Sequence, residues 1–222
     1  MNQYPETGVF TGQDAQVRQL QISKLLRNTY MLLGMTLAFS AVAAYAGMVL
    51  GMPYLGLLTL LPYFGLLFAV EKFKNSSLGI VFVFALTGWL GLTLSPIISA
   101  YIGFGAADTI TLALGGTAAI FFCTSGYVLV TKRNMKFMEG FLMTGILVAF
   151  IAGIANYFLN ITGLGLAVSC MFLLLSSGLI MWQTSEIIHG GETNYISATV
   201  TLYVSIYNIF VSLLSLIGMG ND

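Results

Sequence analysis

The chain has 222 residues, of which 58% are hydrophobic and only 7% are Asp, Glu, Lys or Arg. Water-soluble domains carry roughly 25% charged residues, so this composition excludes a soluble protein and leaves no room for a separate soluble domain. The formal net charge is zero, which gives no support for nucleic-acid binding. We therefore predict an all-α, polytopic membrane protein whose main surroundings are the lipid bilayer.

Residues 1–27 are predicted to form a cytoplasmic N-terminal arm ahead of the first apolar stretch. Basic and apolar residues alternate in it at helical spacings: Val17, Arg18, Leu20, Lys24, Leu25 and Arg27. This pattern predicts a short amphipathic helix at the inner membrane surface. An extended cytoplasmic end of the first membrane helix explains the same pattern equally well.

Seven apolar stretches are long enough to cross a bilayer, which needs about 20 residues per helix. They lie at residues 28–50, 54–72, 77–101, 107–131, 138–158, 161–187 and 195–218. The third contains Ser95-Pro96, and a proline inside a helix kinks it or ends it early. Because the connections are short, we expect the helices to pack mainly as sequential antiparallel neighbours. The seven helices make up one domain, residues 28–218, followed by a short C-terminal tail, 219–222.

The eight Lys and Arg residues predict the orientation of the bundle. They occur before the first helix, between the second and third, and between the fourth and fifth: Arg18, Lys24, Arg27, Lys72, Lys74, Lys132, Arg133 and Lys136. Threading seven helices places all of them on one side, which is the cytoplasmic side in membrane proteins. The N-terminus is thus predicted to be cytoplasmic and the C-terminus periplasmic.

The segment EIIHGGETNYI, residues 186–196, contains the only histidine and two acidic residues. Glu186 and His189 share a helix face, but a di-iron bundle needs two such pairs and two further glutamates. We therefore expect no metal, no cofactor and no catalytic site, and the chain is not predicted to be an enzyme. The segment is a candidate cytoplasmic loop in which Glu186, His189 and Glu192 could sense pH, because histidine titrates near neutral pH.

The same segment has the residues of a turn between two helices. Gly190 and Gly191 are suited to ending the sixth helix. Thr193 or Asn194 is suited to capping the start of the seventh.

Polar residues form a stripe on each of the last two helices. On the seventh, Thr201, Ser205, Asn208, Ser212 and Ser215 recur in steps of four and three; on the sixth, Thr162, Ser169, Ser176 and Gln183 recur every seven. Such stripes face other helices or a wet cavity rather than lipid. Two readings remain open, namely hydrogen bonding between helices and a hydrated polar pathway.

Three segments resemble the Bax-inhibitor (TMBIM-type) membrane family, and in particular its bacterial YccA branch. They are GWLGLTLSPIISAY (88–101), ALGGTAAIFFCTSGYVL (113–129) and HGGETNYISATVTLYVSIYNIFVSLLS (189–215). The resemblance covers residues 24–218, and Ser95 stands where glycine is common in the family. It implies a multi-pass protein of the bacterial inner membrane, with seven helices of which the seventh is surrounded by the first six.

The resemblance implies two functions. Proteins like those of the YccA branch bind and modulate the membrane AAA protease FtsH, which could engage residues 1–12 here. Other members resemble pH-sensitive calcium leak channels with one aspartate on each of the last two helices, at the positions of Gln183 and Ser205. Gln and Ser cannot share a titrating proton as an aspartate pair does, so pH gating is not expected. A neutral polar pathway for calcium between these helices remains the alternative.

Overall fold

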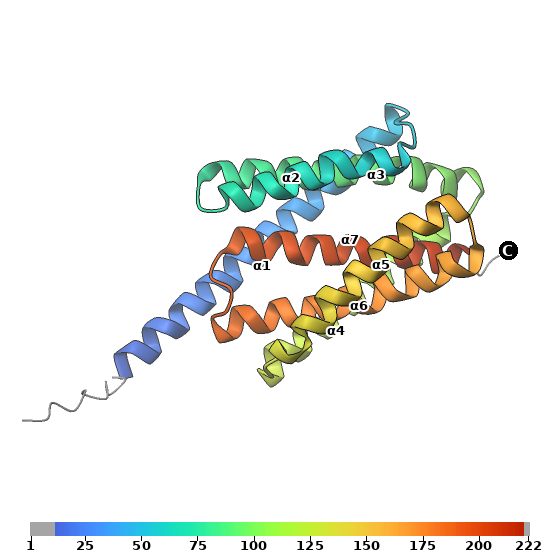
Figure 1. The fold of residues 1–222 in the computed structure, drawn as a ribbon. Helices are drawn as coiled ribbons and strands as arrows, with labels where there is room; N and C mark the ends of the chain where they lie inside the picture. Colours follow the sequence, from blue (N-terminus) through green and yellow to red (C-terminus); the bar gives the residue numbers. More distant parts are fainter. Residues whose placement is uncertain (1–11, 220–222) are drawn as a thin grey trace, which may run out of the picture.

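A computed structural model describes residues 12–219, with side chains described for residues 16–218 (Figure 1). This part of the chain is almost wholly helical and contains no strand. Its elements are α1 (Gly12–Val49), the 3-10 turn η1 (Gly56–Thr59), α2 (Leu60–Phe73), α3 (Ser77–Gly103), α4 (Ala107–Thr131), the 3-10 turn η2 (Lys136–Met138), α5 (Glu139–Leu159), α6 (Thr162–His189) and α7 (Tyr195–Met219). Seven of these helices are long and apolar enough to cross a membrane.

The bounds of α3 to α7 lie within two residues of those predicted from the sequence. The N-terminal segment differs, because residues 12–27 are the first part of the continuous helix α1 rather than a separate amphipathic helix. The described part of this segment is therefore an extension of the first membrane helix, which was the second explanation of its residue pattern. Residues 1–11, the larger part of the predicted arm, lie outside the described residues.

Of the two effects predicted for Pro96, a kink or an early end of the helix, the early end is wrong, since α3 continues to Gly103. Proline lacks the N–H group that would bond the carbonyl four residues earlier. Here that carbonyl belongs to Leu92, and the Ser95 hydroxyl donates a hydrogen bond to it at 2.8 Å. A serine side chain thus replaces the missing bond, which is how membrane helices tolerate proline.

The helices are not packed mainly in chain order, as the short connections had suggested. α1 makes its most extensive contact with α3, while α6 packs on α7 and also on α4 and α5. The α1–α3 approach is close: a Cβ added to Gly91 would lie 2.3 Å from the backbone oxygen of Ser40. The Ser95 hydroxyl also donates to the carbonyl of Ala44 at 3.0 Å. Gly91 therefore lets α1 and α3 pack closely, and the hydroxyl of Ser95 adds a hydrogen bond between them.

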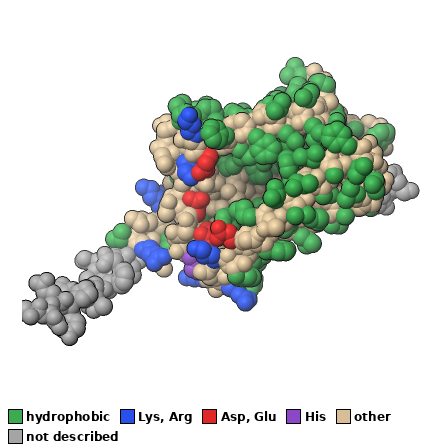
Figure 2. Space-filling model, in the orientation of Figure 1, with side chains coloured by type: hydrophobic (Ala, Val, Ile, Leu, Met, Phe, Trp, Pro, Cys, Tyr) green, Lys and Arg blue, Asp and Glu red, His purple; other side chains and the backbone are tan. Residues whose placement is uncertain are grey.

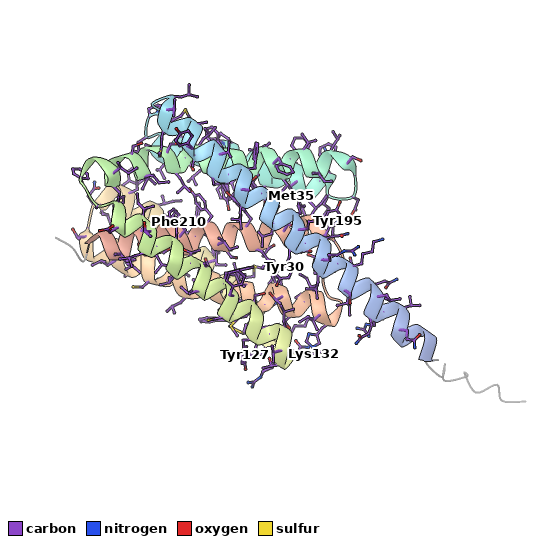
Figure 3. All side chains as sticks on the ribbon, turned by 180° about the vertical axis from the view of Figure 1, so that it is seen from behind. Tyr30, Met35, Tyr127, Lys132, Tyr195 and Phe210 are labelled. Carbon is purple, nitrogen blue, oxygen red and sulfur yellow. The ribbon has the colours of Figure 1, made fainter. Side chains whose placement is uncertain are left out.

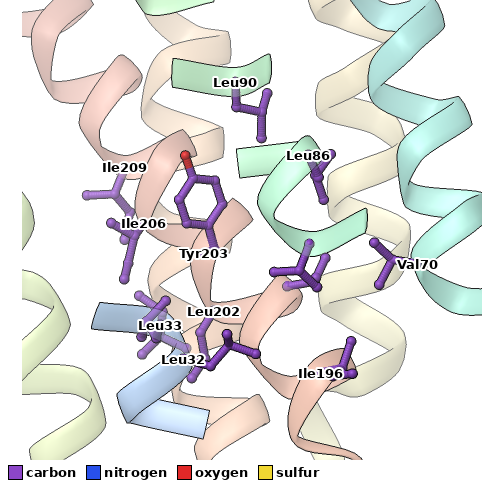
Figure 4. Close-up of a cluster of buried hydrophobic side chains, with 13 residues drawn as sticks. Leu32, Leu33, Val70, Leu86, Leu90, Ile196, Leu202, Tyr203, Ile206 and Ile209 are labelled. Carbon is purple, nitrogen blue, oxygen red and sulfur yellow. The ribbon is translucent and has the colours of Figure 1, made fainter. Parts of the chain in front are cut away.

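Helix α7 supplies the centre of the core. No residue from Tyr195 to Gly218 is exposed, and α7 packs against α1, α3, α4 and α6, with a smaller contact on α2. α5 packs on α6, where Gly145 lies against Leu175. The main hydrophobic cluster joins α7 to the first three helices and α6 (Figure 4); its buried members are Leu32, Leu33, Val70, Val83, Leu86, Leu90, Ile180, Ile196, Val200, Leu202, Tyr203, Ile206 and Ile209.

Charged side chains gather at one end of the bundle, where α1 begins, and hydrophobic side chains cover most of the rest of the visible face (Figure 2). We call this the basic end; it is defined by Arg18, Lys24, Arg27, Lys72, Lys74, Lys132, Arg133 and Lys136. Among them Lys74 pairs with Glu71, and this hydrogen bond raises the pKa of Lys74. The distribution agrees with a bilayer that covers the apolar body and leaves the basic end in water.

Candidate functional site

The α6–α7 turn is built as its sequence predicts. Gly190 adopts φ +80° and terminates α6, and the N–H of Gly191 donates to the carbonyl of Glu186 at 2.9 Å. Only glycine adopts such a φ value without steric cost. Of the two predicted caps for α7, Asn194 is the one used, because its Oδ1 accepts the N–H groups of Ile196 and Ser197 at 2.9 and 3.2 Å.

Two of the three candidate pH-sensing residues, His189 and Glu192, are engaged in local hydrogen bonds. The Nδ1–H of His189 donates to the carbonyl of Ser185 at 2.8 Å, because a carbonyl can only accept. Glu192 accepts the N–H groups of Thr193 and Asn194, both at 2.8 Å. The Glu186 carboxylate lies against Gly191. In the described part of the chain, no three His, Cys, Asp or Glu side chains converge to hold a metal ion.

Three further hydrogen bonds tie the turn to the rest of the basic end. Arg18 of α1 donates to the carbonyl of His189 at 2.9 Å. Asn194 donates to the carbonyl of Lys74 at 3.0 Å and to Oδ1 of Asn75 at 2.9 Å. Between α1 and the turn lies a cavity of about 560 Å³; it is lined by Val17, Arg18, Gln21, Ile22, Leu25, Ile187, Gly190, Glu192 and Thr193.

Two hydroxyls of the α7 stripe donate hydrogen bonds within their own helix. Thr201 donates to the carbonyl of Ser197 at 3.2 Å and Ser205 donates to that of Thr201 at 2.8 Å. Hydroxyls four residues beyond a carbonyl often bond to it in this way. One bond joins the two stripes, from Ser169 of α6 to Ser215 at 3.2 Å.

The remaining stripe residues differ in burial. On α7, Ser212 is buried and Asn208 is half-buried. On α6, Ser176 and Gln183 are 1% and 2% exposed, and neither the Ser176 hydroxyl nor the Gln183 Nε2 has a hydrogen-bond partner among the described residues. Thr162, by contrast, is exposed. A buried polar atom without a partner usually holds a water molecule or has a functional role.

Two tyrosine hydroxyls that bond across helices in the core belong to residues that sequence reasoning missed. The hydroxyl of Tyr203 of α7 donates to Ser40 of α1 at 2.5 Å, and the carbonyl of Thr87 of α3 lies 3.2 Å from the same hydroxyl. One turn further along, the Tyr207 hydroxyl lies 3.0 Å from that of Thr93. The four-residue spacing of the two tyrosines was the available signal, since it places them on one face of the helix.

Comparison with known proteins connects this architecture to a family. The sequence model of the family described as Bax1-I, Inhibitor of apoptosis-promoting Bax1, matches residues 22–222. The chain is 55% identical over 203 residues to the modulator of FtsH protease YccA of Escherichia coli K12, covering 91% of this chain and 93% of that protein. The inner membrane protein YccA of E. coli O6:H1 gives the same values. An uncharacterized protein of Pseudomonas aeruginosa is 47% identical, covering 94% and 95% of the two chains.

Proposed function

The chain belongs to the Bax1-I family as a multi-pass protein of the bacterial inner membrane, and we propose that it binds the protease FtsH and modulates its activity. The observation that carries the proposal is the 55% identity, over nearly the full length of both proteins, to a relative named as a modulator of FtsH. A regulatory role in the membrane, without a specified target, agrees with a family described as an inhibitor and a relative named as a modulator.

The basic end is the surface we assign to the protease contact. The first turns of α1 extend beyond the other helices (Figure 1), and Val17 and Leu20 on them are 52% and 70% exposed. Arg18, between them, is bonded to the α6–α7 turn. A protease bound to this part of α1 would therefore also act on the α6–α7 turn, because Arg18 is hydrogen-bonded to it. The segment that the sequence suggested for engagement by FtsH, residues 1–12, lies almost wholly outside the described residues.

Co-purification from native inner membranes tests the proposal. FtsH should be recovered with the unaltered protein, and Leu20→Gln should reduce the recovered FtsH several-fold. The matched control is Phe104→Gln, which changes another strongly exposed hydrophobic residue in the α3–α4 loop and should leave recovery unchanged. Absence of FtsH from the unaltered preparation, together with normal turnover of other FtsH substrates on overexpression, would refute the proposal.

A second candidate function, a cation leak along α6 and α7, is favoured by the unpartnered polar atoms of Ser176 and Gln183 in the buried interior. Buried polar atoms of this kind suit water or an ion. Gln183 and Ser205 do not titrate, so the unaltered protein in dye-loaded liposomes should show the same calcium flux at pH 6 and pH 8. The double variant Gln183→Asp, Ser205→Asp should make flux depend on pH. If neither the unaltered protein nor the double variant passes more calcium than empty liposomes do, this candidate function is excluded.

A further inference from the structure

A groove of about 490 Å³ opens on the side of the bundle between α1 and α4, and Phe210 of α7 lies in this opening when the molecule is seen from behind (Figure 3). Its walls come from α1 and α4, its floor from α7 and one end from α3. The lining residues on the floor are Tyr203, Ile206, Tyr207 and Phe210. Several wall residues are strongly exposed, including Tyr45 at 67% and Phe122 at 70%. The groove therefore opens toward the surrounding lipid.

The hydroxyl groups deep in the groove already have partners in the protein. Tyr203 donates to Ser40, and Thr117 donates to the carbonyl of Ala113 at 2.7 Å. Tyr207 bonds with Thr93. An occupant with polar groups would gain no hydrogen bonds here and would lose those it makes with water. The chemistry of the groove therefore selects a hydrocarbon.

The length of the groove matches one leaflet of a bilayer. Along α1 it runs from Leu37 to Met48, and along α4 from Ile110 to Phe122; at 1.5 Å per residue these stretches are about 16 and 18 Å long. Half of the hydrocarbon core of a bilayer is about 15 Å thick. The groove lies in the half of the bundle away from the basic end, since α1 ends there and α4 begins there.

The position of the groove favours one kind of occupant. Its wall residues Tyr45 and Phe122 are strongly exposed, and the hydrocarbon chains of lipids surround a membrane helix at this depth. Because the lining is mainly apolar, a single extended acyl chain is the occupant that we assign, and a helix of a second copy is an outcome that the test distinguishes.

We propose that this groove binds one acyl chain of a phospholipid from the leaflet away from the basic end. The chain lies between α1 and α4 and contacts Ile206 and Phe210 of the central helix α7. It fills the space where α1 and α4 do not pack against each other, so a lipid completes the surroundings of α7 on this side. The inference does not depend on the proposed binding of FtsH.

Native mass spectrometry of the full chain released from mild detergent tests the proposal, with myristoyl lysophosphatidylethanolamine as the single-chain probe. The unaltered protein should retain one molecule of this lipid. Ala118 is exposed and lines the groove, and Ala118→Trp should lower the bound fraction about tenfold by filling it. Ala119→Trp is the matched control, because Ala119 is equally exposed but lies outside the lining, and it should retain the lipid. An octanoyl lysolipid, which spans only part of the groove, should bind at least tenfold more weakly than the myristoyl lipid, since each buried methylene adds to affinity.

Equal lipid retention by the two tryptophan variants, or equal retention of the two lysolipids by the unaltered protein, would overturn the proposal. A dimer mass without lipid would overturn it too and would assign the groove to a second copy of the chain. Melting temperature and elution volume show whether the variants fold. If Ala118→Trp does not fold, Ala41→Leu on the α1 wall gives the same test.

Discussion

Replacing Gly91 with alanine probes a close approach of α3 to the backbone of α1. The added Cβ would lie 2.3 Å from the backbone oxygen of Ser40 and 2.9 Å from its hydroxyl. The oxygen belongs to the backbone of a helix, so no side-chain rotation relieves the contact and α1 must move away by most of an ångström. Ser40 also accepts the hydroxyl of Tyr203 at 2.5 Å. The displacement would therefore strain a bond to the central helix.

The expected loss of stability follows from three contributions. Overpacking of a close interface costs about 1–3 kcal/mol, and weakening the Tyr203–Ser40 bond costs about 1 kcal/mol more. Alanine regains about 1 kcal/mol over glycine through its helix propensity. The net loss is about 2 kcal/mol, which lowers the melting temperature of a chain of this size by roughly 4–8 °C.

Thermal unfolding in detergent, followed by the loss of the monodisperse peak in size-exclusion chromatography, measures this change. Gly115→Ala on α4 is the control, because a Cβ there meets nothing within 4 Å and the variant should melt at or slightly above the temperature of the unaltered protein. Equal melting temperatures for Gly91→Ala and Gly115→Ala would refute the close packing of α1 on α3.

Two other substitutions can be measured in the same thermal assay. Asn194→Ala removes the cap of α7 and should lower the free energy of unfolding by about 1–2 kcal/mol. The side chain of Thr193 does not cap the helix, so Thr193→Ala should have little effect. Equal melting temperatures for the two variants would contradict the assigned cap. Lys132→Gly should raise stability by about 1 kcal/mol, because Lys132 ends α4 at φ +50°, where a Cβ is unfavourable. A lower melting temperature for this variant would contradict the left-handed conformation.

The sequence predicted the membrane helices well where their ends carry specific signals. The sixth helix ends at a glycine pair and the seventh begins at Asn194, and both features act locally. The start of α1 was harder to predict, because hydropathy detects only the apolar part of a helix and no glycine or proline interrupts residues 13–28. Helix α3 continues through Pro96 because the hydroxyl of Ser95 bonds to the carbonyl of Leu92. The general rule that proline ends or kinks a helix takes no account of such a side-chain bond.

The polar stripes were located correctly on their helices, but their hydrogen-bond partners could not be predicted. Spacing tells which side chains share a face, yet a hydroxyl can donate within its own helix as readily as across an interface. Ser205 does the former and Ser169 the latter. The bond from Tyr203 to Ser40 was missed because it joins residues 163 positions apart in the chain. Only the packing of α1 beside α7 brings them together.

The burial of α7 has a consequence for the order of assembly. Chains are synthesised from the N-terminus, so α1 to α6 enter the bilayer before the helix that forms their centre exists. Until α7 arrives, the hydroxyl of Ser40 and the carbonyl of Thr87 lack their tyrosine partner, and the main hydrophobic cluster lacks about half of its members. The earlier helices can pair with one another before that point, as α1 does with α3, but the main hydrophobic cluster is complete only when α7 is in place.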